Sequence, residues 1–186
     1  LNVIKRRHKF QGRNSDLLRV YKLMVAKKML KPHVQLPVLL RTKLGKSASG
    51  ILSITVFTSP RPTYTDENGN IKTQKFTCKW NCYYCPNHPN HARSYLPDEP
   101  GCLRAERLDF IAVDQVVERV ETLRRIGHPV DKLEVLVLGG TWESYPEEYR
   151  EGFIRDLFYA ANTFFDDLPK REKYSLPKEQ LINEST

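Results

Sequence analysis

The spacing of apolar and polar positions predicts alternating strands and helices in most of the chain. Residues 51–57 are rich in β-branched and aromatic side chains and follow a glycine, which predicts a buried strand. Residues 114–126 carry apolar side chains at helical spacing, 133–138 form a second strand, and a further helix covers about 146–165. The order strand, helix, strand, helix indicates parallel strands and an α/β fold.

The region before the first strand has a different pattern. Asn14 or Ser15 can cap a helix that continues to about residue 30, with a broad apolar face and basic residues over much of the remainder. Pro37 is expected to keep the next stretch extended, and residues 41–50 are expected to be a flexible basic connection. The sequence therefore predicts a basic helical extension ahead of the α/β part.

Two domains are expected, a basic extension over residues 1–48 and an α/β part over residues 49–186. Within the second, residues 61–77 contain a strong turn signal and are expected to form a small exposed hairpin. Two strand and helix pairs do not close a parallel barrel, and no third strand begins before the last residue. We therefore expect either a fragment or the ordered part of a longer protein.

The positive charge lies almost entirely at the N-terminus. The formal net charge is +8, yet up to residue 46 there are thirteen Lys or Arg and a single acidic residue, Asp16. Such a segment collects phosphate contacts, which favours RNA or DNA as a partner over the plainer alternatives of a solvated tail or an import signal. The predicted RNA-binding residues are Lys5, Arg6, Arg7, Lys9, Arg13, Lys27, Lys28, Lys31, Arg41, Lys43 and Lys46.

Hydropathy and cysteine usage indicate a compartment. No run of about 18 apolar residues could span a bilayer, and the basic N-terminus lacks an apolar segment behind it. Three of the four cysteines crowd into eight positions, which suits a metal site in a reducing compartment better than a secreted disulfide framework. We expect a cytoplasmic or nuclear protein that does not enter a membrane.

The three clustered cysteines are the main candidate for chemistry. Cys78, Cys82 and Cys85 form a C-x3-C-x2-C pattern on one short segment. Three thiolates at this spacing can hold three corners of a 4Fe-4S cluster and leave the fourth iron open to a cofactor.

A zinc site is the alternative interpretation of these cysteines. Zinc would need a fourth protein ligand, for which Cys102, His88 or His91 is available. Cys102 on its own is expected to be a buried or free thiol. The remaining histidines, which have no partner at metal-binding spacing and are expected at the surface or in loops, are His8, His33 and His128.

A glycine pair follows the second predicted strand. Functional residues of parallel α/β domains lie on the loops after the carboxyl ends of the strands, and both the cysteines and Gly139-Gly140-Thr141 follow a strand. Alone, the glycine pair could be no more than a tight turn. Its glycines would let backbone carbonyls approach a bound cofactor closely.

A C-x3-C-x2-C segment after one strand and a glycine pair after the next resemble the radical S-adenosylmethionine superfamily. The resemblance implies the first strand and helix units of a partial TIM-like barrel, a 4Fe-4S cluster, and S-adenosylmethionine that is cleaved to a 5′-deoxyadenosyl radical. It also implies that Tyr84 lies near the adenine and that Gly139, Gly140 and Thr141 contact the cofactor.

Short blocks in a fixed order are, more narrowly, similar to the Elongator catalytic subunit family of tRNA uridine acetyltransferases. They include Cys82-Tyr83-Tyr84-Cys85-Pro86, Leu103-Arg104-Ala105, Val130-Asp131-Lys132 and Pro146-Glu147-Glu148-Tyr149-Arg150. The resemblance implies tRNA and acetyl-CoA as substrates, a carboxymethyl group built at C5 of the wobble uridine, and Lys132 as an acetyl-CoA contact. Other Elongator-type subunits or a second copy of the chain are the implied protein partners.

The chain departs from that family in three respects. The first two cysteines are closer together than in many members, Asn87-His88 stand where those members have two glycines, and an acetyltransferase domain is absent. We expect the fragment alone to be inactive. The alternative function is a tRNA-binding and complex-assembly module that zinc or a cluster stabilises, without radical activity.

Overall fold

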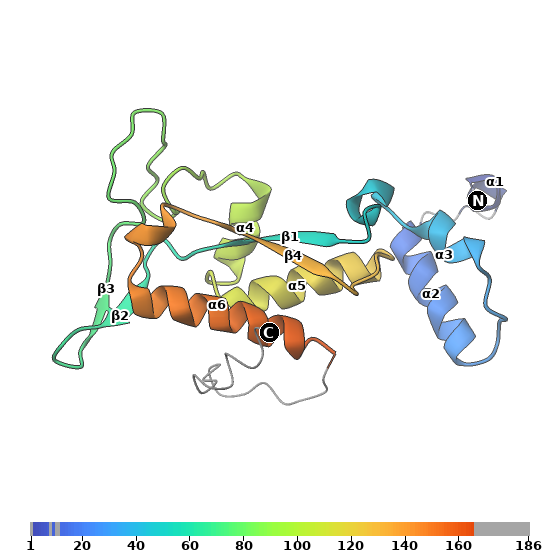
Figure 1. Cartoon of the computed structure of the whole chain (residues 1–186). Coiled ribbons are helices and arrows are strands. Elements are labelled where there is room, and N and C mark those ends of the chain that lie inside the picture. The colour runs from blue at the N-terminus through green and yellow to red at the C-terminus, as the bar shows by residue number, and fades with distance from the viewer. Residues whose placement is uncertain (1, 8, 10–11, 166–186) are drawn as a thin grey trace. The chain divides into compact units, whose positions relative to one another are not determined.

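The computed structural model of the chain describes residues 2–7, 9 and 12–165, without the side chains of residues 2, 4 and 5 (Figure 1). The chain divides into two compact units, one made of Leu1–Ser53 with Val120–Glu134 and the other of Ile54–Arg119 with Val135–Thr186. No helix in the described part of the chain is both long and apolar enough to cross a membrane.

The first unit is mainly helical. Its N-terminal elements are α1 (Asn2–Arg7), α2 (Asn14–Ala26), α3 (Gln35–Leu40) and the 3-10 helix η1 (Leu44–Ser47). Helix α2 ends earlier than predicted because Lys28 adopts a left-handed φ of 57°. The expectation that Pro37 keeps its segment extended is wrong: Pro37 lies in the first turn of α3, where the N–H that proline lacks needs no helical partner. Part of the expected flexible connection is the helix η1.

A close contact holds α2 in the first unit. Leu18 is completely buried, and a Cβ at Gly127 would lie only 2.8 Å from its Cδ2. Gly127 also has a φ of +97°, which side chains with a Cβ rarely adopt. The position therefore requires glycine on both grounds.

His128 lies in the loop after α5, in agreement with its predicted place at the surface or in a loop, but it is buried in the first unit. The residue is 4% exposed, and its Nδ1 lies 2.8 Å from the Ser47 hydroxyl oxygen. Burial lowers the pKa of His128, and the positive charges of Arg41, Lys46 and Lys43 lower it further, against a hydrogen bond with the Thr42 backbone. The neutral form of the imidazole is therefore favoured.

Two parallel strands confirm the predicted α/β class. Strands β1 (Leu52–Phe57) and β4 (Leu133–Leu138) are neighbours in a two-stranded sheet (Figure 1). The Leu52 N–H donates to the Lys132 carbonyl at 2.9 Å, and the Thr58 N–H donates to the Leu138 carbonyl at 2.9 Å. Residue numbers rise in the same direction along both strands, so the strands are parallel. The barrel implied by the resemblance stays a prediction.

Helices connect and follow these strands. They are α4 (Pro100–Arg107), α5 (Ala112–Arg125), the 3-10 helix η2 (Trp142–Ser144) and α6 (Glu147–Asn162). Both α5 and α6 lie within a few residues of the predicted bounds, whereas α4 was not predicted. Pro100 stands at the start of α4, where its fixed φ suits the first helical turn.

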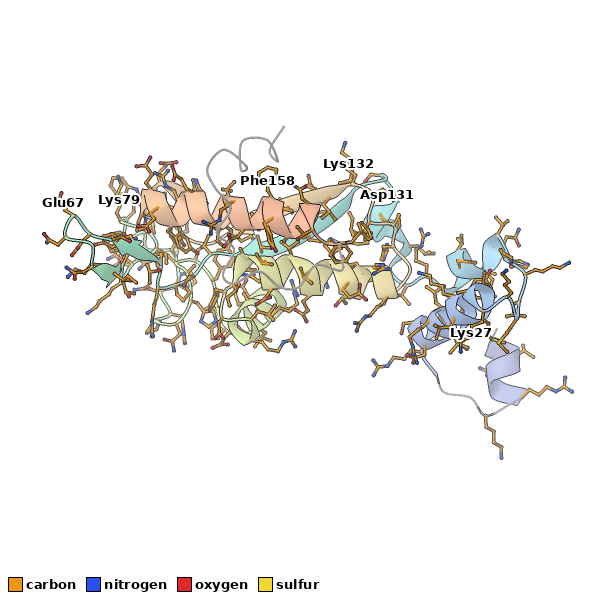
Figure 2. The ribbon with its side chains drawn as sticks, turned by 90° about the horizontal axis from the view of Figure 1, so that it is seen from below. Lys27, Glu67, Lys79, Asp131, Lys132 and Phe158 are labelled. Atoms are coloured by element: carbon orange, nitrogen blue, oxygen red, sulfur yellow. The ribbon has the colours of Figure 1, made fainter. Side chains whose placement is uncertain are left out.

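The predicted hairpin is confirmed. Strands β2 (Thr63–Thr65) and β3 (Ile71–Thr73) pair antiparallel with Tyr64 opposite Lys72. The Asp66 carboxylate closes the turn by accepting hydrogen bonds from the N–H groups of Asn68 and Asn70, at 3.0 and 2.8 Å. Figure 2 shows Glu67 at the exposed tip of this hairpin.

The carboxyl end of β1 is fixed by the core of the second unit. Phe57 is buried, and the Gln115 side chain bonds both its N–H and its carbonyl, at 2.8 and 2.9 Å. A Cβ at Gly101 would meet the Phe57 ring at 2.5 Å, so α4 packs closely on the same side chain. The loop that follows β1 therefore starts from a rigid point.

Candidate functional site

The three clustered cysteines lie on one loop between β3 and α4. Cys78, Cys82 and Cys85 are all free thiols and partly exposed, and the Cys85 N–H donates to the Cys82 carbonyl at 3.2 Å. Among residues 2–7, 9 and 12–165, no three His, Cys, Asp or Glu side chains are gathered closely enough to hold a metal ion. The donors are chemically suited to an iron-sulfur cluster, but their sulfurs must converge to hold one.

The loop after β4 that carries Gly139, Gly140 and Thr141 (the glycine loop) contacts the loop that carries Cys78, Cys82 and Cys85 (the cysteine loop). The Sγ of Cys78 and the Oγ1 of Thr141 are 3.0 Å apart, although 63 residues separate them in the sequence. The structure thus brings together the two segments that the sequence singled out. Their roles toward a cluster or a cofactor stay predictions.

Both glycines of this loop are required by close packing. A Cβ on Gly140 would overlap the carbonyl oxygen of Thr77, and a Cβ on Gly139 would overlap the hydroxyl of Thr58. Gly140 therefore lets the glycine loop lie directly against the backbone that precedes Cys78. This packing is a structural reason for the glycine pair in addition to the predicted contact with a cofactor.

Tyr145 joins the glycine loop to the end of β1. The Gly140 N–H donates to the Tyr145 hydroxyl at 3.0 Å, and this hydroxyl lies 2.6 Å from Oγ1 of Thr58, which donates to the Leu138 carbonyl at 3.3 Å. With Thr58 as donor to the Leu138 carbonyl, Tyr145 donates to Thr58, and every donor in this series of hydrogen bonds is satisfied. Burial raises the pKa of Tyr145 and keeps the phenol protonated.

A small cavity lies beside this hydrogen-bonded chain. Its volume is about 130 Å³, and Thr58, Gly139, Gly140 and Tyr145 are among the residues that line it. Ligand pockets typically measure roughly 300–1,000 Å³, so this cavity by itself is too small for a molecule the size of S-adenosylmethionine.

Arg93 holds the cysteine loop from its other side. Its guanidinium donates to Oδ1 of Asn81 at 2.7 Å and to the Cys82 carbonyl at 3.3 Å. Its backbone N–H donates to the Thr77 hydroxyl at 2.7 Å. Sequence reasoning did not identify Arg93, Thr58 or Tyr145, and the available signal was only the place of Thr58 directly after a predicted strand.

The surroundings of Cys78 favour its thiolate. Burial alone would raise the pKa of this thiol, but hydrogen bonds from Thr141 and from the Trp80 backbone, with the charge of Arg93, hold the pKa below its ordinary value. The neighbouring Cys82 and Cys85, as negative charges, raise the pKa of Tyr84. A thiolate is the form that binds metal.

The residues proposed to complete a zinc site lie in other surroundings. Cys102 is 1% exposed and packs with Phe57 and Ala105, which confirms it as a buried free thiol, and burial raises its pKa to about 11. His91 is buried with Nδ1 3.3 Å from Nδ1 of His88. Among the described residues, none of these groups joins the clustered thiols in a set of three or more side chains that could hold a metal ion.

The remaining predicted cofactor contacts are exposed. Tyr84 is 86% exposed on the cysteine loop. Lys132 belongs to the first unit, directly before β4, and Figure 2 shows its side chain projecting away from the ribbon.

The predicted RNA-binding side chains all belong to the first unit. The side chain of Lys5 lies outside the described residues. Arg41 and Lys46 are half-buried, and the exposed members are Arg6, Arg7, Lys9, Arg13, Lys27, Lys28, Lys31 and Lys43. Figure 2 shows Lys27 on this unit. None of the described side chains in this set forms an ion pair with another described residue.

Comparison with known proteins gives related sequences but no matching protein-family model. The chain is 34% identical over 120 residues to tRNA uridine(34) acetyltransferase of Dehalococcoides mccartyi (strain CBDB1), covering 64% of this chain and 23% of that protein. It is 39% identical over 143 residues to Elongator complex protein 3 of Drosophila melanogaster, covering 74% and 23%, respectively. The protein of the same name from Schizosaccharomyces pombe is 36% identical over 143 residues, covering 73% and 24%. The chain therefore spans less than a quarter of the length of these relatives.

Proposed function

Because the chain belongs to the family of Elongator complex protein 3 and tRNA uridine(34) acetyltransferase, we propose that it is part of an enzyme that modifies the wobble uridine of tRNA. The proposed reaction builds a carboxymethyl group at C5 of this uridine from acetyl-CoA. Its proposed cofactors are a 4Fe-4S cluster on Cys78, Cys82 and Cys85 and S-adenosylmethionine. A bound cluster and cofactor would supply a carbon radical that activates the acetyl methyl group.

One observation carries this proposal: the 3.0 Å contact between Cys78 and Thr141. A cofactor that binds an open iron must be reached by the segment that holds the cluster and also by a segment that holds the cofactor. The cysteine loop and the glycine loop meet at this contact, and the Tyr145 chain fixes the second loop on the ends of β1 and β4.

The chain's own residues have distinct proposed roles. The three thiolates bind iron, and Arg93 both orients the loop and offers a positive charge to an anionic cluster. The glycine loop offers backbone groups to the cofactor, with Tyr84 against its adenine. Lys132 can pair with a phosphate of CoA, and the basic residues that the sequence predicts to bind RNA, between Lys5 and Lys46, contact tRNA.

A tRNA-binding and assembly module is the second proposed function. It is favoured by the cysteine sulfurs, which are not gathered into a metal-binding set in the described structure. As a relative of Elongator complex protein 3, the chain would then contact other subunits or a second copy of itself.

Metal loading distinguishes the cluster enzyme from an assembly module that zinc stabilises. The purified chain is reconstituted anaerobically with iron and sulfide, and its iron, acid-labile sulfide and zinc are measured. Cys82→Ala should lose most of the iron, whereas the control Cys102→Ser, which changes a buried thiol outside the loop, should retain it. Stoichiometric zinc without iron, or equal iron in wild type and Cys82→Ala, would argue for the assembly module.

A further inference from the structure

A groove of about 950 Å³ lies along α2 in the first unit. One wall is a face of α2 and its start, and the other is the C-terminal end of α5. Basic side chains stand on both walls, namely Arg13, Arg19, Lys22, Arg124 and Arg125. Only Arg13 of these belongs to the basic residues that the sequence singled out, and neither arginine of α5 does.

Buried contacts fix the helix ends that form this groove. Leu18 of α2 is fully buried and lies against Gly127, just beyond the end of α5. Leu123 of α5 is 1% exposed. The basic side chains therefore project from two anchored helix segments, which lowers the entropic cost of arranging them around a ligand.

The two acidic residues of the groove are engaged locally. Asp16 accepts a hydrogen bond from the Arg13 N–H at 3.2 Å, at the start of α2. Glu121 binds Arg124 at 3.2 Å and Arg125 at 2.9 Å, and these contacts lower its pKa although partial burial opposes them. Glu121 thus holds two guanidinium groups at the groove while occupying donors that another anion could use.

The chemistry of the lining favours a polyanion. Five cations face two acids, and the hydroxyls of Ser15 and Thr122 add uncharged donors of the kind that contact phosphates. The apolar lining is confined to Leu23, Ala26 and Ile126, with no aromatic side chain, unlike the aromatic core of many protein interfaces. The volume exceeds that of a single phosphate group and suits a stretch of nucleic-acid backbone.

We propose that this groove binds the phosphate backbone of RNA, with Arg124 and Arg125 as contacts and Glu121 as the competing anion. The inference rests on the proposed tRNA substrate and extends its binding surface to α5. Phosphate oxygens displace part of the Glu121 contact and take over guanidinium donors. An acidic protein segment is the rival occupant, and a comparison of tRNA with polyglutamate as ligands distinguishes the two.

Salt-dependent RNA binding tests the groove. Fluorescence anisotropy with labelled tRNA gives the Kd of the full chain over a range of salt concentrations, without any metal. Arg124→Gln with Arg125→Gln should weaken binding about 10-fold near 0.1 M salt and reduce the slope of log K against log salt by about 1–2, since each phosphate bound contributes about 0.7–0.9 to that slope. The matched control is Lys72→Gln with Arg107→Gln, which removes two cations from exposed ion pairs of the second unit and should change neither quantity.

Glu121→Gln gives a second, opposite test. It removes the Glu121 contacts of Arg124 and Arg125 together with a negative charge, so tRNA should bind about two- to threefold more tightly with a steeper salt slope. An affinity and slope unchanged in both the arginine and the Glu121 variants would overturn the inference while leaving the tRNA proposal intact. Polyglutamate serves as the probe for an acidic protein segment. If the arginine variant lost polyglutamate binding while its tRNA binding stayed unchanged, the inference would be overturned in favour of a protein partner. A wild-type chain that fails to bind tRNA would overturn both proposals.

Discussion

The hydroxyl oxygens of Thr58 and Tyr145 lie 2.6 Å apart, although the two residues are 87 positions apart in the sequence. Thr58 follows β1 directly, and Tyr145 follows the loop after β4. Their contact ties together the carboxyl ends of two parallel strands, where α/β proteins place their sites. The geometry of the glycine loop therefore depends on a pair of residues outside both sequence motifs.

Removal of the Tyr145 hydroxyl should loosen the glycine loop. In Tyr145→Phe the partly buried Gly140 N–H loses its acceptor, and the loss approaches the penalty of about 1–3 kcal/mol for an unsatisfied buried donor only where water cannot replace the hydroxyl. We expect the Gly140 amide to exchange its hydrogen about 5- to 100-fold faster. The control is Tyr83→Phe, which removes a fully exposed hydroxyl from the neighbouring loop and should leave this rate unchanged. Unaltered exchange in Tyr145→Phe would mean that Tyr145 does not hold the loop.

Gly140→Ala should destabilise the second unit. The new methyl group overlaps the Thr77 carbonyl, which is backbone and cannot rotate away, so the two loops must separate at a cost of about 1–3 kcal/mol. Urea unfolding measures this loss. Gly152→Ala in α6 is the matched control, because its Cβ would have an ordinary 3.7 Å contact with Arg155 and alanine favours helix. Equal stability of the two variants would contradict close packing at Gly140.

Acid should destabilise the first unit through His128. Its pKa is lowered in the folded chain, so the unfolded chain binds the proton more readily and stability falls as pH drops below the ordinary value of 6.5. The His128 amide, which donates to the Leu123 carbonyl, should lose protection against hydrogen exchange between pH 7.5 and 5.5, after correction for the intrinsic rate. His128→Gln should show a smaller loss over that range. The same pH dependence in both proteins would assign it to another group.

Neutralising the basic N-terminus should weaken tRNA binding. Changing Arg6, Arg7 and Lys9 to Gln removes exposed cations, so the affinity should fall and the salt slope should decrease by up to about 0.9 for each phosphate that is no longer neutralised. The control variant carries Lys72→Gln in β3 and Lys75→Gln just after it, both in the second unit. An unchanged slope in the N-terminal variant would exclude this segment from the binding surface.

Apolar periodicity was sufficient to predict the central elements. Strand β4 has the predicted bounds, and β1 and α5 differ by one or two residues, because β-branched and other apolar residues mark the strands and helical apolar spacing marks α5. It was insufficient for α3 and α4, whose starts contain Pro37 or Pro100. The sequence alone does not distinguish a proline in the first turn of a helix from a proline that breaks a helix.

The candidate site was predictable only where chain order determines it. Loops after neighbouring parallel strands leave the sheet at the same edge, so topology favours the approach of Cys78 to Thr141. The hydrogen-bond partners of Tyr145 and His128 could not be predicted in this way. Thr58 lies more than 80 residues from Tyr145, and Ser47 more than 80 residues from His128, so nothing local indicates either pair. Burial of a polar side chain depends on such distant partners.

Electron paramagnetic resonance of the anaerobically reconstituted, reduced chain tests most directly whether the cysteine loop holds a cluster with an iron open to a cofactor. We predict a cluster signal in wild-type protein that changes when S-adenosylmethionine is added, and no such signal in Cys82→Ala. A signal that S-adenosylmethionine leaves unchanged would show that no iron is open to the cofactor. Absence of any cluster signal from wild-type protein, together with bound zinc, would contradict the cluster itself.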